Sequence, residues 1–407
     1  MLRFIHCADV HLGRSIKTHT DMPEHMSLSI QQATYTSFEE IITIALEKNV
    51  DFVLISGDVY DQEQRFIRGQ WFLKKQGERL REYNIPLFII HGNHDPLIKD
   101  KPENVDNVYV FPTEIEAIKI TNNDGDNIFI HGFSYPQKGF YDNPAPLFVR
   151  KGSEEDYHIA LLHGQETTQS EHEPYAPFTV KELEERNFDY WALGHIHKRS
   201  ILNTSPPIVY SGSIQGGHRN ELGEKGCYYV ELSKSTANLT FINTASVIWE
   251  SFCFSIDSLH KMEDLLELVE EGLQDLHSNT IYLVTIELHG YGILHDKLIE
   301  EQQDFLYTLR NEVVAPYIWV DRVELHTSPI YDRNKLKEQD HLLGDVIRVV
   351  DDRKVNRSEI DSVFKPIFSH ATVKKYVDQL TNDEIHDLLD QAEKKLLSPL
   401  LSEVKKQ

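Results

Sequence analysis

Five short groups of histidine, aspartate and asparagine occur in the first half of the chain, and each follows an apolar run of strand character. They are Asp9-Val10-His11, Gly57-Asp58-Val59-Tyr60-Asp61, Gly92-Asn93-His94-Asp95, His163-Gly164 and Gly194-His195-Ile196-His197. An α/β scaffold collects such side chains at the carboxyl ends of its strands, in one cleft. Imidazoles, carboxylates and an amide, without a thiolate, suit two borderline or hard divalent ions such as Mn²⁺. The spacing predicts a dinuclear hydrolytic site.

Taken singly, most of these groups have a simpler structural explanation. An aspartate at a strand end is often a helix N-cap, and Gly-Asp or His-Gly is more typical of a turn than of a metal ligand. The group from Gly92 to Asp95 is rarer, because it places an amide, an imidazole and a carboxylate on one turn. Five groups in this order, each after a strand, favour a metal site over five unrelated turns.

The order of these groups resembles the calcineurin-like metallophosphoesterase family over roughly residues 1–215. The opening from Arg3 to Gly13 is similar to the first motif of the SbcD-type DNA-repair nucleases in that family, and most similar to the bacterial YhaO exonucleases. Asp61 stands where some relatives carry a histidine, a difference that the SbcD branch tolerates. Gln62 and Asp95 stand where the protein phosphatases of the family carry arginine and glutamate, which counts against a phosphoprotein phosphatase.

A centre with two metal ions needs a carboxylate that bridges them, and Asp58 is the candidate. The other six ligands are expected in two sets, a division that the resemblance also implies: Asp9, His11 and His197 for one ion, and Asn93, His163 and His195 for the other. Water activated by the ions would attack phosphorus in line with the leaving oxygen. His94, next to a ligand but not itself one, is expected to assist the leaving oxygen as a catalytic acid, with Asp95 orienting its imidazole.

Two further segments allow alternative interpretations. His131-Gly132 follows an apolar run and imitates His163-Gly164, so His131 is the main rival for that ligand position. We expect His163, because its spacing before the last ligand group matches the family. The run Tyr210-Ser211-Gly212-Ser213, followed by Glu221 and Lys225-Gly226, resembles the family's closing loop beside the site. On sequence alone, a polar turn between two strands explains that run equally well.

The composition limits the class of protein. A chain of 407 residues predicts two or three domains. Its three widely spaced cysteines are typical of reduced thiols, and it has no leader-like start and no apolar stretch of roughly 20 residues. We therefore expect a cytoplasmic protein that does not enter a membrane. The formal charge of −24 opposes nucleic-acid binding at long range, so phosphate contacts would come from local residues such as Lys198-Arg199, Arg65 and Arg68, or from a partner.

The expected fold is α/β, with a metallophosphoesterase β-sandwich flanked by helices over residues 1–250. Helical periodicity over 262–276 and 298–309, with strands over 281–288 and 317–325, predicts a small α/β cap domain over residues 251–330. Its place resembles the DNA-selecting cap of this nuclease family. Residues 331–407 show helical periodicity only, and Thr381-Asn382-Asp383 predicts an N-cap for the last helix.

These features together predict a metal-dependent DNA exonuclease or endonuclease that hydrolyses phosphodiester bonds at DNA ends in repair, with two divalent ions, Mn²⁺ above all, as cofactors. The tail is expected to dock an SbcC-type ATPase, although on sequence alone folding back onto the rest of the chain is equally compatible, as is a homodimer. One alternative is a phosphodiesterase of the same superfamily that acts on a substrate other than DNA. The other is a non-catalytic subunit of a DNA-associated ATPase assembly, against which His94 and the complete ligand set count.

Overall fold

The computed structural model describes residues 1–16, 22–61, 67–97, 105–167, 175–338, 341–355, 357–368 and 380–404. Contacts between residues separate the chain into two compact units. The first combines Met1–Ser251 with Leu276–Thr285 and Ala315–Asp321, and the second combines Phe252–Asp275, Ile286–Val314 and Arg322–Gln407. Each unit is therefore assembled from segments that are distant in the sequence.

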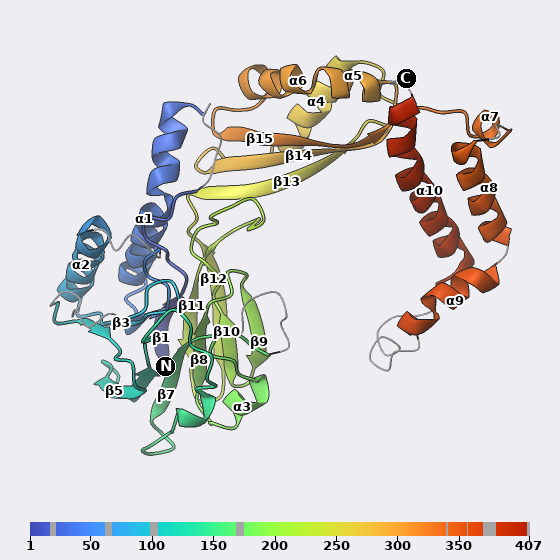
Figure 1. The fold of residues 1–407 in the computed structure, drawn as a ribbon. Coiled ribbons are helices and arrows are strands. Elements are labelled where there is room, and N and C mark those ends of the chain that lie inside the picture. Colours follow the sequence, from blue (N-terminus) through green and yellow to red (C-terminus); the bar gives the residue numbers. More distant parts are fainter. Residues whose placement is uncertain are drawn as a thin grey trace. The chain divides into compact units, whose positions relative to one another are not determined.

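Two six-stranded sheets form most of the first unit (Figure 1). The first sheet has the order β12-β11-β1-β2-β3-β4, in which β1 to β4 are parallel, β11 is antiparallel to β1, and β12 is antiparallel to β11. The strands are β1 Leu2–Cys7, β2 Phe52–Ser56, β3 Leu87–Ile90, β4 Val108–Val110, β11 Gly226–Leu232 and β12 Ala237–Asn243.

The second sheet has the order β5-β6-β7-β8-β10-β9, in which β6, β7, β8 and β10 are parallel and the two edge strands are antiparallel to their neighbours. The strands are β5 Glu116–Thr121, β6 Asn127–Gly132, β7 Tyr157–His163, β8 Tyr190–Gly194, β9 Ser200–Thr204 and β10 Pro207–Tyr210. Parallel strands in each sheet thus end at a common edge, where the predicted ligand groups lie.

The central strands are apolar throughout because both of their faces are covered. Side chains alternate between the faces of a strand. In β2, Phe52 and Leu54 enter the core between the two sheets, which also contains Tyr190 of the second sheet. Val53 and Ile55 enter the core on the other face of the first sheet. The uninterrupted apolar run that predicted β2 is therefore the sequence of a strand buried on both sides.

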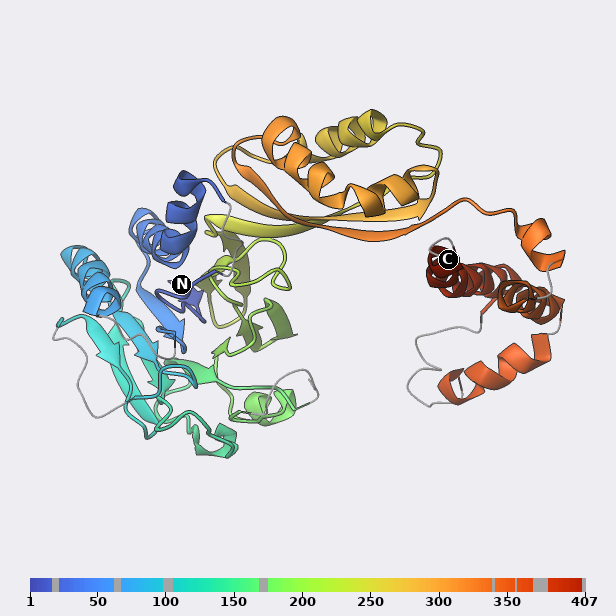
Figure 2. The same ribbon diagram turned by 45° about the horizontal axis from the view of Figure 1, so that its top comes forward.

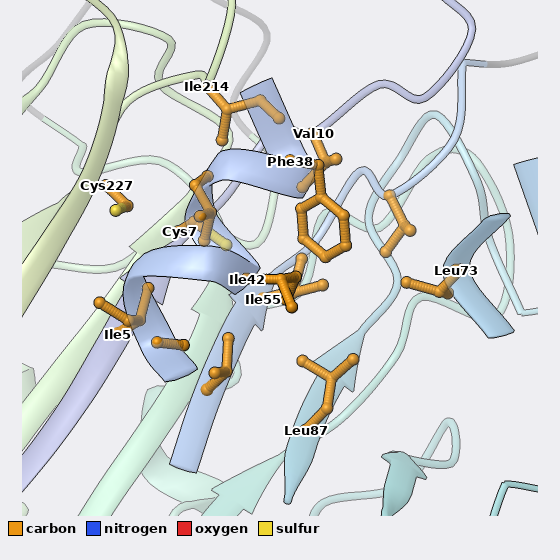
Figure 3. Close-up of a cluster of buried hydrophobic side chains, with 14 of the residues drawn as sticks. Ile5, Cys7, Val10, Phe38, Ile42, Ile55, Leu73, Leu87, Ile214 and Cys227 are labelled. Atoms are coloured by element: carbon orange, nitrogen blue, oxygen red, sulfur yellow. The ribbon is translucent and has the colours of Figure 1, made fainter. Parts of the chain in front are cut away.

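Two helices, α1 Glu24–Glu47 and α2 Ile67–Glu82, cover the outer face of the first sheet. Figure 3 shows Phe38 of α1 and Leu73 of α2 in the same apolar cluster as Ile55 and Leu87. The outer face of the second sheet has its own core, in which Trp191 is fully buried under loops, the 3₁₀-helix Ala145–Leu147 and α3 Val180–Glu184. The predicted β-sandwich flanked by helices is confirmed.

A third sheet has the order β13-β14-β15. Its strands are long: β13 Val247–Ser255, β14 Ile281–Tyr291 and β15 Ile318–Ser328. In the first unit, Trp249, Leu283 and Trp319 near the starts of these strands pack with Met26 and Ile30 of α1. In the second unit, one face of the sheet is covered by α4 Met262–Leu273, α5 Leu294–Glu300, α6 Gln302–Thr308 and the π-helix Leu309–Val313 (Figure 2). The predicted small α/β element is present, and both β14 and β15 continue three residues beyond their expected ends.

The tail contains helices, and no strand among its described residues: α7 Arg333–Glu338, α8 Leu342–Val355, α9 Arg357–Phe368 and α10 Asn382–Val404. Leu343 and Ile347 of α8 pack with Leu397 and Leu401 of α10, so the tail has a small core of its own. The predicted N-cap is confirmed, because the Glu384 backbone N–H donates to Thr381 Oγ1 at 3.3 Å and the Glu384 carboxylate accepts from the Thr381 backbone N–H at 2.7 Å.

In the part of the chain that the structure describes, no helix has the length and apolarity needed to cross a membrane.

Candidate metal centre

The five predicted ligand groups meet at the carboxyl ends of parallel strands from both sheets. Asp9, Asp58 and Asn93 lie in the loops that follow β1, β2 and β3, whereas His163 is the last residue of β7 and His195 follows β8. The core between the sheets brings the two sets of loops together. The structure therefore collects all seven predicted ligands in one place, and their role as metal ligands stays a prediction.

The loops after β1 and β2 are joined through their backbones. The N–H of Asp9 donates to Gly57 O at 3.1 Å, and the N–H of His11 donates to Asp58 O at 2.9 Å. Asp9, His11 and Asp58 all adopt left-handed backbone conformations, with φ of 50°, 45° and 50°. Such residues are strained unless the surrounding structure holds them, and they concentrate at functional sites.

A glycine allows the β3 loop to approach the centre closely. A Cβ atom built at Gly92 would overlap Asp58 Oδ1 and would lie 2.7 Å from His163 Nε2. No other residue fits there without moving one of the two predicted ligands.

The first predicted ligand set is closely grouped. One donor atom from each of Asp9, His11 and His197 lies within 4.8 Å of the others. The Nε2 atoms of His11 and His197 are 3.2 Å apart, and His197 Nε2 is 3.8 Å from Asp9 Oδ1. Asp9 and His11 are buried, and His197 is partly exposed.

The second set also adjoins Asp58. His163 Nε2 is 2.9 Å from Asn93 Oδ1 and 3.5 Å from Asp58 Oδ2, and His195 Nδ1 is 3.2 Å from Asn93 Oδ1. Asp58 Oδ2 is also 3.8 Å from His11 Nε2. One oxygen of Asp58 therefore lies within 4 Å of a ligand from each set, which is the position that a bridging carboxylate needs.

The hydrogen bonds of His163 and His197 fix which nitrogen of each neutral ring is left with a lone pair. His163 Nδ1 donates to Ser56 O at 3.0 Å and His197 Nδ1 donates to the Glu221 carboxylate at 2.6 Å, so the Nε2 atom of each neutral ring carries a lone pair. Those lone pairs face Asn93 Oδ1 and His11 Nε2. The buried Nδ1 of His11 has no hydrogen-bond partner among the described residues. Ring nitrogens of His163 and His197 that are directed into the centre with a free lone pair are suited to bind cations.

The charges of the centre lead to the same conclusion. Burial, and then the neighbouring Asp58, raise the pKa of Asp9 well above its ordinary value. Burial and the charge of Asp95 raise the pKa of Asp58 to about 7. Burial lowers the pKa of His11 well below its ordinary value and that of His163 to about 4. Folding thus confines carboxylates that repel one another beside neutral imidazoles, and two divalent cations would offset that repulsion.

Glu221 is the main residue beside the centre whose role the sequence did not reveal. Its carboxylate holds His197 by the 2.6 Å hydrogen bond, accepts from the Gly217 backbone N–H at 2.6 Å and lies 3.8 Å from the Arg14 guanidinium. Although burial opposes it, the hydrogen bond from His197 lowers the pKa of Glu221 to about 2. The loop resemblance at Tyr210–Gly226 was the available indication, but the contact with His197 depends on tertiary structure.

His94 lies beside the centre, and its role as an acid that is not a ligand stays a prediction, because one of its ring nitrogens lies within 4.8 Å of donor atoms of His11 and Asp58. Its backbone N–H donates to Asp58 Oδ1 at 2.9 Å, and its half-exposed ring meets the His11 ring edge to face, with centroids 4.9 Å apart. The carboxylate beside its imidazole is that of Asp61, whose Oδ1 is 3.7 Å from His94 Nδ1. That distance is too long for a direct hydrogen bond in this arrangement.

Asp95 does not contact the His94 ring in the way that we expected. Its Oδ2 accepts from the backbone N–H groups of Val59 and Tyr60 at 2.9 and 3.2 Å and from His91 Nδ1 at 2.7 Å, and its Oδ1 accepts from the Gly92 N–H at 2.9 Å. These bonds tie the β2 loop to the β3 loop. The Asp61 carboxylate lies beside both the His94 and the His11 rings, with Oδ1 at 3.7 Å from His94 Nδ1 and 3.8 Å from His11 Nδ1.

The rival ligand His131 lies away from the centre, in the second sheet. Its Nε2 is 2.9 Å from His158 Nδ1, and its ring packs edge to face on Phe188. Burial lowers the pKa of His131 to about 3, so it is a neutral core residue. Among the described residues it belongs to no group of candidate metal ligands.

Basic side chains lie next to the centre. Lys225 is buried and donates to His197 O at 2.9 Å, and Arg199 donates to Glu224 O at 2.9 Å with its guanidinium over the Phe241 ring. With the exposed Lys198 they line a cavity of about 240 Å³ that includes His197. Of the other two predicted phosphate-contacting residues, Arg68 packs over the Tyr35 ring. Arg65 lies outside the described residues.

Comparison with known proteins extends over both units. Residues 2–199 match the calcineurin-like phosphoesterase family, and residues 249–328 match the middle domain of metallophosphoesterase YhaO. The chain is 31% identical over 402 residues to the uncharacterized metallophosphoesterase YhaO of Bacillus subtilis (strain 168), covering 96% of each protein. It is 28% identical over 402 residues to the DNA double-strand break repair protein Mre11 of Methanocaldococcus jannaschii, with 94% of this chain and 99% of the relative covered. The corresponding protein of Saccharolobus solfataricus is 25% identical over 401 residues, with 88% and 97% covered.

Proposed function

Because the chain belongs to the calcineurin-like phosphoesterase family, we propose that it is a metal-dependent nuclease that hydrolyses phosphodiester bonds at DNA ends in repair. The observation that carries the proposal is the position of Asp58, whose buried carboxylate lies within 4 Å of a histidine from each ligand set. A hydrolase acting on phosphoesters follows from the family. The choice of DNA is supported by the relatives named as DNA double-strand break repair proteins.

We propose that Asp9, His11 and His197 hold one divalent ion, that Asn93, His163 and His195 hold the other, and that Asp58 is shared. The bound ions, for which we propose Mn²⁺, would supply an activated water near neutral pH and stabilise charge on the phosphoryl group. The mixed imidazole and oxygen donors support Mn²⁺ over Mg²⁺, which prefers carboxylate and water.

The protein's own acid is His94. Its ring lies beside the Asp61 carboxylate, and its backbone N–H donates to Asp58. We propose that it gives a proton to the leaving 3′ oxygen and takes no part in holding the ions. A positioned acid of this kind contributes a factor of about 10²–10⁴ to the rate. Asp61 would keep the imidazole in the orientation needed for that transfer.

DNA contacts would come from the basic cavity beside His197, since the chain as a whole is acidic. Exposed Lys198 and the guanidinium of Arg199 can follow the phosphates on one side of the scissile bond, whereas Lys225 is committed to the His197 carbonyl. The predicted cap, residues 251–330, would limit which DNA ends enter the centre.

The test is cleavage of end-labelled single- and double-stranded DNA by the full chain with Mn²⁺, with Mg²⁺ and with a chelator. We expect cleavage with Mn²⁺ that the chelator abolishes and that Asp58→Asn abolishes. Hydrolysis of a small chromogenic phosphodiester, without cleavage of any DNA, would replace this proposal with a phosphodiesterase acting on another substrate. Failure to hydrolyse either substrate would favour the non-catalytic subunit.

We further propose that the tail, residues 331–407, docks an SbcC-type ATPase, in the cytoplasm where DNA ends are found. The apolar side chains of α8 and α10 that are not used in the tail's own core support this: Val349, Leu388 and Leu396 are 55%, 41% and 55% exposed. Amphipathic helices with such a face commonly dock in a groove of a partner. Leu388→Glu with Leu396→Glu is expected to abolish co-purification with the ATPase and to spare cleavage of simple DNA. Unchanged binding would refute the docking surface.

A further inference from the structure

The face of the third sheet opposite its helices carries three kinds of metal donor in the second unit. Along β14, Ile286 and Leu288 are buried beneath the helices, while Glu287 and His289 point the other way and are accessible. Cys253 of β13 is exposed on the same side as Glu287, to which its thiol donates at 3.7 Å. A thiol, a carboxylate and an imidazole from neighbouring strands therefore share one surface.

The donor atoms converge. His289 Nε2 is 3.4 Å from Glu287 Oε2, and one donor atom of each of the three residues lies within 4.8 Å of the other two. On the neighbouring strand β15, the His326 ring stacks on the His289 ring with centroids 4.9 Å apart and an interplanar angle of 24°. His326 Nε2 is in turn 3.8 Å from the Glu324 carboxylate. A fourth donor is thus adjacent to the three that already meet.

We propose that Cys253, Glu287 and His289 bind a thiophilic divalent cation, Zn²⁺, at a site separate from the catalytic centre. Thiolate, imidazole and carboxylate are the three ligand types of zinc in proteins, and three of them leave a fourth position for water or for His326. The thiolate distinguishes this site from the catalytic centre, whose donors are nitrogen and oxygen only and suit harder ions. Binding releases the thiol proton that now lies between Cys253 and Glu287.

The packing of the sheet does not account for these residues. Cys253 and His289 are exposed, so neither fills space in a core. Glu287 Oε2 contacts both Cys253 and His289, so this one carboxylate oxygen brings the thiol and the imidazole together. A cation would cross-link β13 to β14 at the end of the sheet that belongs to the second unit, where no disulfide does so, since all three cysteines are free.

Cobalt provides a readout that the catalytic centre cannot imitate. The full chain, stripped with chelator and titrated with Co²⁺, is expected to show a thiolate-to-cobalt charge-transfer absorption in the near ultraviolet, which Zn²⁺ displaces and Mn²⁺ does not. Cys7 and Cys227 are fully buried in the core of the first unit, so the absorption reports on Cys253. The same band is expected in Asp58→Asn, which disables only the catalytic centre.

Three variants decide the proposal. Cys253→Ser is expected to lose the absorption, and His289→Ala to weaken Co²⁺ binding at this site by at least about tenfold. Ser255→Ala, at an exposed position two residues along the same strand, is the matched control and is expected to retain it. Absence of the band in the unaltered chain, its persistence in Cys253→Ser, or equal affinity in His289→Ala would each overturn the site.

Discussion

At the scale of single residues, His94 and Asp58 are predicted to fail in different ways. His94→Ala removes a group that gives a proton but holds no ion, so turnover is expected to fall by about 10²–10⁴-fold with both metals retained. Asp58→Asn removes the carboxylate that faces both ligand sets, so metal content itself is expected to fall. Metal analysis of the two purified variants separates the roles. A metal-free His94→Ala protein would show that His94 is a ligand and not the acid.

Asp61 gives a finer test of how His94 is held. Its carboxylate lies 3.7 Å from His94 Nδ1, whereas Asp95 is committed to backbone N–H groups and His91. Asp61→Asn is therefore expected to lower turnover less than His94→Ala and to leave the fold intact, while Asp95→Asn is expected to lower stability. Thermal unfolding measured beside turnover distinguishes the two. Equal losses of stability would mean that both carboxylates act structurally.

Glu221 is predicted to set metal affinity through His197. A carboxylate that holds the far nitrogen of a ligand histidine fixes its tautomer and direction, and its loss typically weakens metal binding by about 10–100-fold. Glu221→Gln is expected to show a loss in that range in a metal titration of the chelator-treated chain. Glu224→Gln, three residues along the same loop and exposed, is the matched control and is expected to bind as the unaltered chain does.

At the scale of elements, the contact between β1 and β8 is predicted to make stability depend on pH. His6 lies between the sheets, 3.0 Å from Tyr190 Oη and 3.2 Å from Leu193 O, and burial lowers its pKa to about 3. Unfolded histidine has a pKa of about 6.5, so between about pH 6.5 and 3 only the unfolded chain takes up this proton. The contribution of His6 to the free energy of unfolding is therefore fully present above about pH 6.5. Below that pH it declines by up to about 1.4 kcal/mol per pH unit.

Urea unfolding between about pH 7 and 5, in the presence of chelator, measures that slope. His6→Gln removes the titrating group and is expected to flatten the dependence by the share of His6. Tyr190→Phe removes a hydrogen-bond partner but keeps the histidine, so it is expected to lower stability while the slope remains. Identical slopes in His6→Gln and the unaltered chain would contradict this account.

The sequence predicts elements well where a local pattern determines them. Apolar runs such as Phe52–Ile55 predicted buried strands, and the predicted ligand groups follow those strands. Thr381 predicted the start of α10. The membership in the calcineurin-like family is confirmed. What the sequence could not predict depends on contacts between distant segments. The partner of Asp95, the hold of Glu221 on His197 and the continuation of β14 through Gly290 are set by neighbours that no local pattern identifies.

At the scale of the whole molecule, the net charge of −24 makes the few basic residues beside the centre decisive. Lys198→Ala is expected to weaken DNA binding and to reduce the slope of log K against log salt by about 1, the value for one phosphate contact. Hydrolysis of a small chromogenic phosphodiester is expected to be unchanged. Lys181→Ala, at a side chain that is 84% exposed, is the matched control. An unaltered salt slope in Lys198→Ala would place the DNA elsewhere.

The division of the third sheet between the two units affects how the predicted cap can be studied. Leu283 and Trp319 lie within residues 251–330 but belong to the apolar cluster around Met26 and Ile30 of α1. Deleting that range would therefore expose Met26 and Ile30 of the first unit as well as remove the predicted cap. Substitutions on the accessible face that avoid the proposed zinc ligands, such as Glu324, are the better way to test whether the predicted cap selects DNA.

The left-handed backbone at Asp9, His11 and Asp58 has a consequence for how this chain can drift in evolution. Only glycine, asparagine, aspartate and a few others occupy such a conformation at low cost, and branched side chains are disfavoured there. In descendants that abandon catalysis, we expect these positions to settle on asparagine or glycine, while His163, fully buried in an ordinary strand, is expected to accept side chains of similar size. The left-handed conformation of these loops would then persist after the metal ligands are lost.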